Sequence, residues 1–196
     1  MSDPQILLIL AGLPGSGKTT FSEALIRLSP LTALENTSSD NACATKHNLA
    51  TNKRLWIRAS QDEAARKRRQ EVEAKVRWGL SMGFNVVVDR MGFDRPQRSH
   101  FVAIANEFNP RPLTCCLVFT VTQQTLTRRL LIRKSHPTIQ DGEQAIRVLH
   151  QTRKVWQPPT VDGEGFDRIH LLQEWQQPDA ANGWTVDRLV WVMSQI

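Results

Sequence analysis

Nine residues near the start of the chain, GLPGSGKTT, have the composition and spacing of a phosphate-binding loop. The pattern G-x-x-x-x-G-K-[ST] is satisfied by Gly12, Gly17, Lys18 and Thr19. The glycines let backbone N–H groups turn toward phosphate oxygens, and a helix that follows adds positive potential at its N-terminus. A lysine at this position reaches the β- and γ-phosphates, while the next hydroxyl ligates magnesium. The motif therefore predicts a bound ATP or GTP that also contacts Gly15, Ser16 and Thr20, with Mg²⁺ at Thr19.

Two aspartates are candidates for the carboxylate chemistry that accompanies phosphoryl transfer. Asp89 ends the apolar run VVVD, which matches a Walker B strand whose carboxylate helps to hold magnesium. Asp40 follows the segment LTALENTSS, which we interpret as a weaker strand. Simpler explanations stay open, because many parallel strands end in an acidic residue and Asp40 could cap a helix or form a turn.

A third group of candidates is basic. Arg129 and Arg133 are four residues apart and therefore share one helical face. Such a face suits a clamp on the γ-phosphoryl group as its charge redistributes, although a solvated basic face has the same pattern. The segment SHPTIQDG then interrupts the helix. We interpret residues from about 123 to 143 as a small helical lid that excludes water from the nucleotide.

The elements that must hold these residues alternate between strands and helices. Apolar runs predict strands at residues 6–10, 84–89, 113–121 and 166–172, and LTALENTS at 31–38 predicts a weaker one. Helical spacing predicts helices between them, including one that ends near Pro30 and a long charged one over residues 61–81. The alternation predicts an α/β fold: a P-loop NTPase-type parallel sheet of about five strands with helices on both faces, in a single domain over residues 1–196. Ligands bind beyond the carboxyl ends of such strands, so the loop, Asp40 and Asp89 should converge there.

Composition and charge restrict the class of partner. A net charge of +6 and a sequence pI near 9.7 favour polyanions such as nucleic acid or acidic metabolites. The basic clusters NKRLWIR and RKRRQ could follow a phosphate backbone or form solvated faces. The apolar run ILLILAGL is too short to span a membrane, and the three cysteines and five histidines show no metal-ligand spacing. We therefore expect a soluble protein of the reducing cell interior, cytoplasmic or nuclear, without membrane contact.

Four segments together resemble the polynucleotide 5′-hydroxyl kinase family, which includes the phage enzyme and the kinase domain of the eukaryotic polynucleotide kinase/phosphatase. They are GLPGSGKTTF, the aspartate of TSSD, FNVVVDR after a long helix, and LTRRLLIRKSHPTI followed by RKVWQPPTVDGEGFDRI. The resemblance spans about residues 6–172. It implies a P-loop kinase that uses magnesium to transfer the γ-phosphate of ATP or GTP to the 5′-hydroxyl end of a nucleic acid.

The resemblance also implies roles for single residues. Asp40 would be the general base, Asp89 would orient the acceptor, and Arg133 would contact the transferring phosphoryl group, with Arg129 one turn before it. Arg90 and Arg95 could bind acceptor phosphates in place of family residues that this chain lacks. Two positions depart from the family pattern. Cys43 stands where the phage-type motif has an arginine, and Met91–Gly92 replaces the Thr-Asn of the usual Asp-x-Thr-Asn.

These departures concern the acceptor and leave two other functions open. One is a small-molecule kinase that acts on a nucleoside, a sugar or a nucleotide-sugar. The other is a nucleotide-binding adaptor that has lost its acceptor chemistry, with Cys43 and Met91 as the visible losses. The three hypotheses agree on the nucleotide site and differ on the hydroxyl that receives the phosphate.

Overall fold

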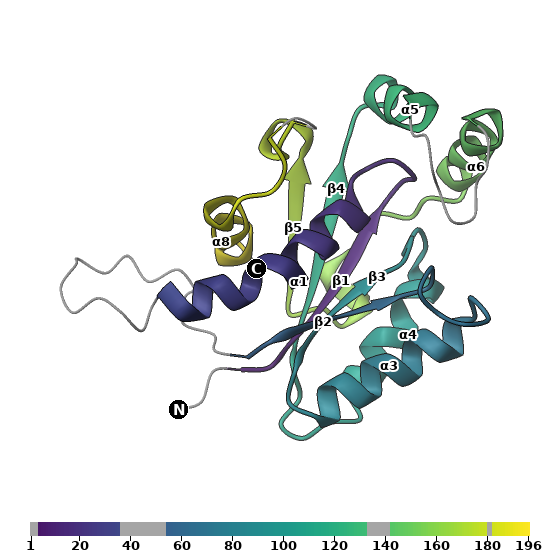
Figure 1. Ribbon diagram of the computed structural model, residues 1–196. Helices are drawn as coiled ribbons and strands as arrows, with labels where there is room; N and C mark the ends of the chain where they lie inside the picture. The colour runs from purple at the N-terminus through teal and green to yellow at the C-terminus, as the bar shows by residue number, and fades with distance from the viewer. Residues whose placement is uncertain (1–3, 36–53, 133–141, 180–181) are drawn as a thin grey trace.

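A five-stranded parallel sheet forms the centre of the molecule. The computed structural model describes residues 4–35, 54–132, 142–179 and 182–196. The strands are β1 (Ile6–Gly12), β2 (Trp56–Ser60), β3 (Asn85–Asp89), β4 (Leu113–Thr120) and β5 (Arg168–Gln173), in the spatial order β2-β3-β1-β4-β5. Every neighbouring pair is parallel, so all five carboxyl ends lie at one edge, as Figure 1 shows. The α/β fold class predicted from the sequence is confirmed.

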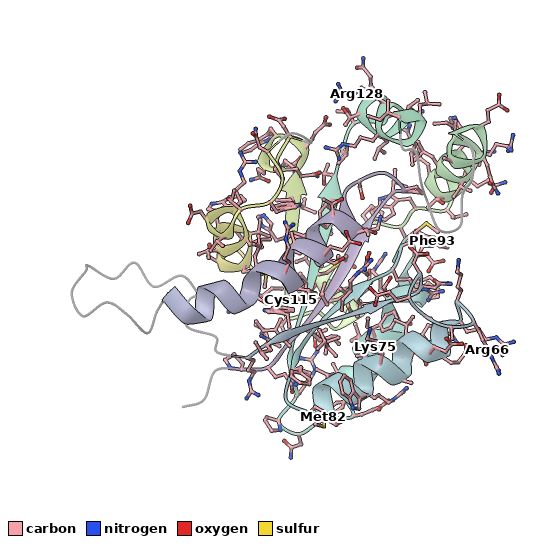
Figure 2. The ribbon with its side chains drawn as sticks, viewed as in Figure 1. Arg66, Lys75, Met82, Phe93, Cys115 and Arg128 are labelled. Atoms are coloured by element: carbon pink, nitrogen blue, oxygen red, sulfur yellow. The ribbon has the colours of Figure 1, made fainter. Side chains whose placement is uncertain are left out.

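The apolar content of each strand matches its place in the sheet. The three central strands, β1, β3 and β4, are near-continuous apolar runs because both of their faces are covered. The edge strands β2 and β5 are mixed in sequence, WIRAS and RIHLLQ, and are only partly buried. Figure 2 shows Cys115 of β4 among the side chains of the sheet, whereas Arg66 and Met82 lie at the periphery.

Helices cover both faces of the sheet (Figure 1). On one face, α1 (Lys18–Glu35) and α8 (Val186–Ser194) pack against alternate residues of β1 such as Leu8 and Leu10. On the other, α3 (Arg69–Ser81) and α4 (Arg95–Ala105) pack against Leu7 and Ile9. The two faces therefore have separate apolar cores, and each helps to fix the position of β1.

The connection from β4 to β5 contains three helices: the first two lie at the carboxyl edge of the sheet (Figure 1), and the third contacts α4. They are α5 (Gln123–Ile132), α6 (Gly142–Lys154) and the short α7 (Val161–Glu164), and a 3-10 helix, η1 (Glu174–Gln176), follows β5. α5 and α6 pack together through a small apolar cluster of Leu126, Leu130, Ala145 and Leu149, which also contacts Leu13 beside the phosphate-binding loop. α5 lies within the predicted lid segment of residues 123–143, whereas α6 begins only at its end.

The second strand is not the segment that the sequence suggested. Residues 31–35 belong to α1, which continues past Pro30 to Glu35, so the predicted strand at 31–38 is wrong over its described part. Leucine, alanine and glutamate are strong helix formers, and here they outweigh the loss of one N–H at Pro30. In the described part of the chain the second strand is β2, Trp56–Ser60, which begins within the basic cluster NKRLWIR and continues past it.

The charged helix also begins later than predicted. α3 starts at Arg69 rather than at residue 61, and residues 61–68 form turns. Lys67 there has φ of 52°, in the left-handed region, and Arg68 is an extended N-cap residue. Polar residues 61–67 consequently lie at the carboxyl edge of the sheet, directly after β2.

Candidate active site

The segment GLPGSGKTT joins β1 to α1, as the phosphate-binding motif requires. Gly17 has φ of 102°, which favours glycine. A Cβ on Gly12 would lie 2.8 Å from Ser16 Oγ and 3.1 Å from Phe119 Cβ, so β4 approaches the loop too closely for a side chain. The first turn of the helix closes with Phe21 N–H donating to Gly17 O at 3.0 Å. The loop therefore has the backbone conformation and the helix N-terminus that phosphate groups require.

Lys18 lies within the loop and is 8% exposed. Its Nζ donates to Gly12 O at 2.9 Å, to Leu13 O at 3.0 Å and to Ser16 Oγ at 3.3 Å. The ammonium group is thus positioned by acceptors of the loop itself. Its positive charge is available at the point where the motif places the β- and γ-phosphates.

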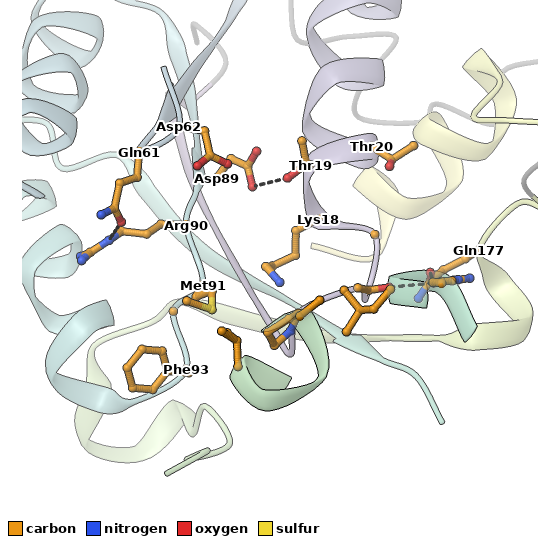
Figure 3. Close-up of a pocket in the computed structure, with 18 of the residues that line it drawn as sticks. Lys18, Thr19, Thr20, Gln61, Asp62, Asp89, Arg90, Met91, Phe93 and Gln177 are labelled. Carbon is orange, nitrogen blue, oxygen red and sulfur yellow. Dashed lines mark hydrogen bonds between the residues drawn. The ribbon is translucent and has the colours of Figure 1, made fainter. Parts of the chain in front are cut away.

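Asp89 lies beside the first turn of α1 at the end of β3. Thr19 Oγ1 donates to Asp89 Oδ1 at 3.4 Å (Figure 3). Ser22 Oγ donates to Asp89 Oδ2 at 3.0 Å. A hydroxyl and a carboxylate are the hard oxygen ligands that Mg²⁺ prefers, together with phosphate oxygens and water. No cluster of three or more potential metal ligands occurs in the described residues, so these two groups fit a nucleotide-bound ion rather than a metal cage built by the protein alone.

Arg129 reaches from α5 over the phosphate-binding loop. Its Nη1 donates to Gly15 O at 3.5 Å, to Ser16 O at 3.4 Å and to Gln177 Oε1 at 3.1 Å. Burial lowers the pKa of Arg129, although the charge of Glu174 acts in the opposite direction. Its neighbour Arg128 lies on the outer side of α5 (Figure 2). The predicted nucleotide contact Arg129 is therefore placed at the loop.

Gln177 is a residue of this site that the sequence did not reveal. It follows η1, is 8% exposed, and its Oε1 accepts from Arg129. Its Nε2 is buried and has no hydrogen-bond partner in the described structure. An unpaired buried donor is costly, so a ligand oxygen or nitrogen at this position would satisfy it. No motif marks a glutamine after the last strand, and only the fold brings it to the loop.

Asp62 and Arg90 lie across the cavity from the loop. Asp62 is two residues after Ser60, which is in register with Asp89 in the neighbouring strand. Arg90 Nε donates to Gln61 Oε1 at 2.6 Å, and Gln61 Nε2 donates to Lys67 O at 2.8 Å. Arg90 Nη1 is buried without a partner among the described atoms, and burial followed by the charge of Arg69 lowers its pKa. Gln61 therefore holds a cationic group at the cavity.

The loop after β3 is held by a buried ion pair that the sequence did not reveal. Arg98 of α4 is fully buried and pairs with Glu164, at 2.8 Å from Nε and 2.7 Å from Nη2. Its Nη1 donates to Gly92 O and to Gln157 O, both at 2.9 Å. Arg98 thus fixes the backbone of Met91–Gly92, the two residues that differ from the family motif, against the chain around α7.

One cavity of about 650 Å³ joins these two groups of residues (Figure 3). On the side of the loop it is lined by residues including Gly15, Gly17, Lys18, Thr19, Thr20, Arg129 and Gln177. On the other side it is lined by residues including Gln61, Asp62, Lys67, Asp89, Arg90, Met91 and Phe93. The predicted residues Asp40 and Arg133, and the departing residue Cys43, lie outside the described part of the chain.

A family model described as "AAA domain" matches residues 7–159, which is most of the chain. The chain belongs to the AAA domain family. A curated relative of this AAA domain, "Transcription factor bHLH140" from Arabidopsis thaliana, is 27% identical over 168 residues. The match covers 84% of this chain and only 16% of the relative, so the chain spans about a sixth of the length of that protein.

Solved structures, two kinases among them, share the fold of this AAA domain. A fungal RNA kinase has a TM-score of 0.63 at 14% identity, with 98% of this chain and 85% of that chain covered. Kti12 from Chaetomium thermophilum, in complex with ADP-AlF3, has a TM-score of 0.58 at 17% identity, with 95% of each chain covered. A gluconokinase from Sinorhizobium meliloti has a TM-score of 0.55 at 14% identity, with 99% and 94% covered. The AAA domain thus has a P-loop kinase-type fold, and none of its described helices could cross a bilayer.

Proposed function

We propose that this AAA domain transfers the γ-phosphate of ATP or GTP to a 5′-hydroxyl end of a nucleic acid. One observation carries the proposal: a single cavity has the phosphate-binding loop on one side, and on the other side it has the carboxylate of Asp62 with the cationic residues Lys67 and Arg90. Hydrolysis would need only the first half. A second half with its own polar side chains is suited to binding an acceptor, which is what transfer requires.

The donor half supplies charge neutralisation. The backbone of the loop and Lys18 would bind the β- and γ-phosphates, and Arg129 would add a second cation above the loop. Thr19, with Asp89 beside it, would hold Mg²⁺, which supplies positive charge on the phosphate oxygens. We propose that α5 and α6 act as the lid of a single-domain enzyme, because they carry Arg129 and pack on Leu13 next to the loop.

Asp62 is the carboxylate that we propose as general base. The family resemblance implies this role for Asp40, after a strand expected at residues 31–38. Residues 31–35 are helical, and the described strand that follows α1 is β2, which ends two residues before Asp62. Parallel strands place the residues after them at one edge, and β2 ends beside Asp89 in register. Asp62 lines the cavity and is exposed to it, so its carboxylate can accept the proton of an acceptor hydroxyl. Asp40 stays a second candidate, to be tested alongside it.

The nucleic acid acceptor is supported by charge. Arg90 and Lys67 line the same side of the cavity, and Arg90 Nη1 is buried without a partner among the described atoms. A net charge of +6 would attract a polyanion over longer range. The structural neighbour that is an RNA kinase agrees with this class of acceptor.

A small-molecule kinase is the second candidate. Met91 and Phe93 add apolar surface to the acceptor side, and a cavity of about 650 Å³ would suit a small polar metabolite beside the nucleotide. The gluconokinase neighbour agrees with that alternative. The two candidates differ in whether a phosphodiester chain extends from the reacting hydroxyl.

An acceptor panel separates these functions. Purified protein is incubated with Mg²⁺ and γ-labelled ATP or GTP, and with 5′-hydroxyl RNA, 5′-hydroxyl DNA, nucleosides and sugars in parallel. We expect label on oligonucleotide ends, lost in Lys18→Ala. Label on small molecules alone would favour the second candidate, and nucleotide binding without any labelled acceptor would favour an adaptor.

A further inference from the structure

The contacts of Asp89 are divided unequally between its two carboxylate oxygens. Oδ2 accepts from Arg58 Nε at 2.9 Å, from Arg58 Nη2 at 2.5 Å and from Ser22 Oγ at 3.0 Å. Oδ1 faces Thr19 Oγ1 at 3.4 Å. Asp89 is 6% exposed, so its rotation depends on these partners rather than on water. The hydrogen bonds to Oδ2 therefore fix the orientation of the carboxylate, and in this orientation Oδ1 faces Thr19.

Arg58 is itself fixed from three sides. It lies on the edge strand β2 with its side chain 11% exposed, and its Nη1 contacts Glu63 at 2.6 Å and Glu23 at 3.5 Å. Burial lowers the pKa of Arg58, but the hydrogen bond and charge of Asp89, with the charges of Glu63 and Glu23, more than compensate, and the pKa is raised. The guanidinium group is thus a permanent cation in one position.

The position of these donors decides which of two roles Asp89 can take. An acceptor hydroxyl would have to donate to a carboxylate oxygen, and Oδ2 already has both guanidinium donors and the hydroxyl of Ser22. The other oxygen points to Thr19, the hydroxyl that would ligate magnesium. Asp89 is consequently oriented toward the metal side of the cavity and not toward the acceptor.

We infer that Arg58 is a positioning residue for magnesium: with Ser22 it turns Asp89 Oδ1 toward the ion at Thr19. The inference rests on the proposed use of a magnesium nucleotide. Groups that hydrogen-bond the ligands of a metal fix their orientation, and their loss commonly weakens metal affinity by about 10- to 100-fold. Arg58 has this relation to Asp89. Arg58 itself is not among the residues that line the cavity, so it would act through Asp89.

The test is a Mg²⁺ titration of nucleotide binding without any acceptor. Binding of a fluorescent ATP analogue is followed as Mg²⁺ is added to the unchanged protein and to Arg58→Met. We expect Arg58→Met to need at least about tenfold more Mg²⁺ for the half-maximal change, with affinity for metal-free nucleotide little altered. Arg77→Met is the matched control, because Arg77 pairs with Glu107 on the surface of α3 and should leave the titration unchanged.

Three further variants keep the test decisive if Arg58→Met does not fold. Arg58→Lys retains the charge but cannot donate from two nitrogens, so it should shift the titration in the same direction by less. Asp89→Asn should lose the Mg²⁺ effect, because its amide oxygen would face the donors of Arg58 and its NH₂ group would face Thr19. Ser22→Ala should give a smaller shift than Arg58→Met.

The outcomes separate the inference from the proposed function. An unchanged or lower Mg²⁺ requirement in the folded Arg58 variants would overturn the inference, as would a raised KM for the acceptor with an unchanged Mg²⁺ requirement. Because no acceptor is present in the titration, the shift can be seen even in a protein that labels none. In that case the proposed function fails and the role of Arg58 stands.

Discussion

Single hydrogen bonds decide much of the chemistry at this cavity. Gln177 is the clearest case, because Arg129 fixes its Oε1 and leaves Nε2 buried without a partner in the described structure. A nucleotide acceptor atom at this point would recover the cost of that unpaired donor. Fold, rather than motif, brings Gln177 into this position.

Replacing Gln177 by Leu should weaken nucleotide binding. One net hydrogen bond contributes about 1 kcal/mol, so we expect Kd for ATP or GTP to rise by about fivefold. Titration calorimetry measures the change, and Gln124→Leu, on the exposed face of α5, is the matched control. Equal affinities for Gln177→Leu and the unchanged protein would show that Nε2 does not face the nucleotide.

Single substitutions can also decide whether Asp62 or Asp40 is the general base. Asp62→Asn should reduce phosphoryl transfer by about 10²- to 10⁴-fold, because the acceptor hydroxyl loses its base, and should leave Kd for nucleotide unchanged. Asp40→Asn, assayed in parallel, should retain transfer. The reverse result would return the role to Asp40 and remove Asp62 from the mechanism.

At the scale of elements, α4 and the chain around α7 hold the acceptor side in place. The connection is the buried pair of Arg98 with Glu164, and the bonds of Arg98 to Gly92 O and Gln157 O. Breaking a buried pair leaves an uncompensated charge, which costs more than the pair itself contributes.

Glu164→Gln should therefore lower the free energy of unfolding by about 3–5 kcal/mol. Urea denaturation measures the loss. Glu107→Gln, which breaks an exposed pair with Arg77, should cost no more than about 1 kcal/mol. A loss for Glu164→Gln as small as that of the control would mean that the loop after β3 is held by other contacts.

Sequence patterns predicted the three central strands, and of the two edge strands they predicted β5 and missed β2. The runs in β1, β3 and β4 are apolar throughout, and α4 has Pro96 in its first turn with Asp94 as a side-chain cap. β2 was missed because Arg58 interrupts it, and that arginine is present to contact Asp89, a tertiary partner that no local pattern can show. The phosphate-binding loop was predicted because its motif consists of residues that are adjacent in the sequence, so a local pattern is enough to show it. The proposed acceptor side includes residues that follow β2, so Asp62 was not among the predicted residues. Asp40 lies outside the described residues and stays a prediction.

The burial of strand β4 predicts that its two cysteines react poorly in the native protein. Cys115 and Cys116 are both 0% exposed, and burial raises the pKa of Cys115 to about 12, while it raises that of Cys116 further. Both thiols stay protonated at pH 8, and a thiol in this form is a poor nucleophile. Mass spectrometry after iodoacetamide treatment should find the two cysteines unmodified in the native protein and alkylated in urea. Native modification would contradict the burial of β4.

At the scale of the whole molecule, net charge is the property that favours the proposed polyanionic acceptor. The net charge of +6 acts over about 10 Å at moderate ionic strength, and Lys67 and Arg90 lie at the cavity. KM for an oligonucleotide should therefore rise steeply as KCl is increased from 50 to 200 mM, by about tenfold for two to three phosphate contacts. KM for the nucleotide, measured in the same assays, should change much less. A flat oligonucleotide KM would indicate an acceptor bound without phosphate contacts.

The acceptor panel tests the central claim most directly. With Mg²⁺ and γ-labelled ATP or GTP, the account predicts label at the 5′ end of a 5′-hydroxyl oligonucleotide, lost in Lys18→Ala and in Asp62→Asn while Asp62→Asn still binds nucleotide. Label on a sugar or nucleoside with none on oligonucleotides would contradict it.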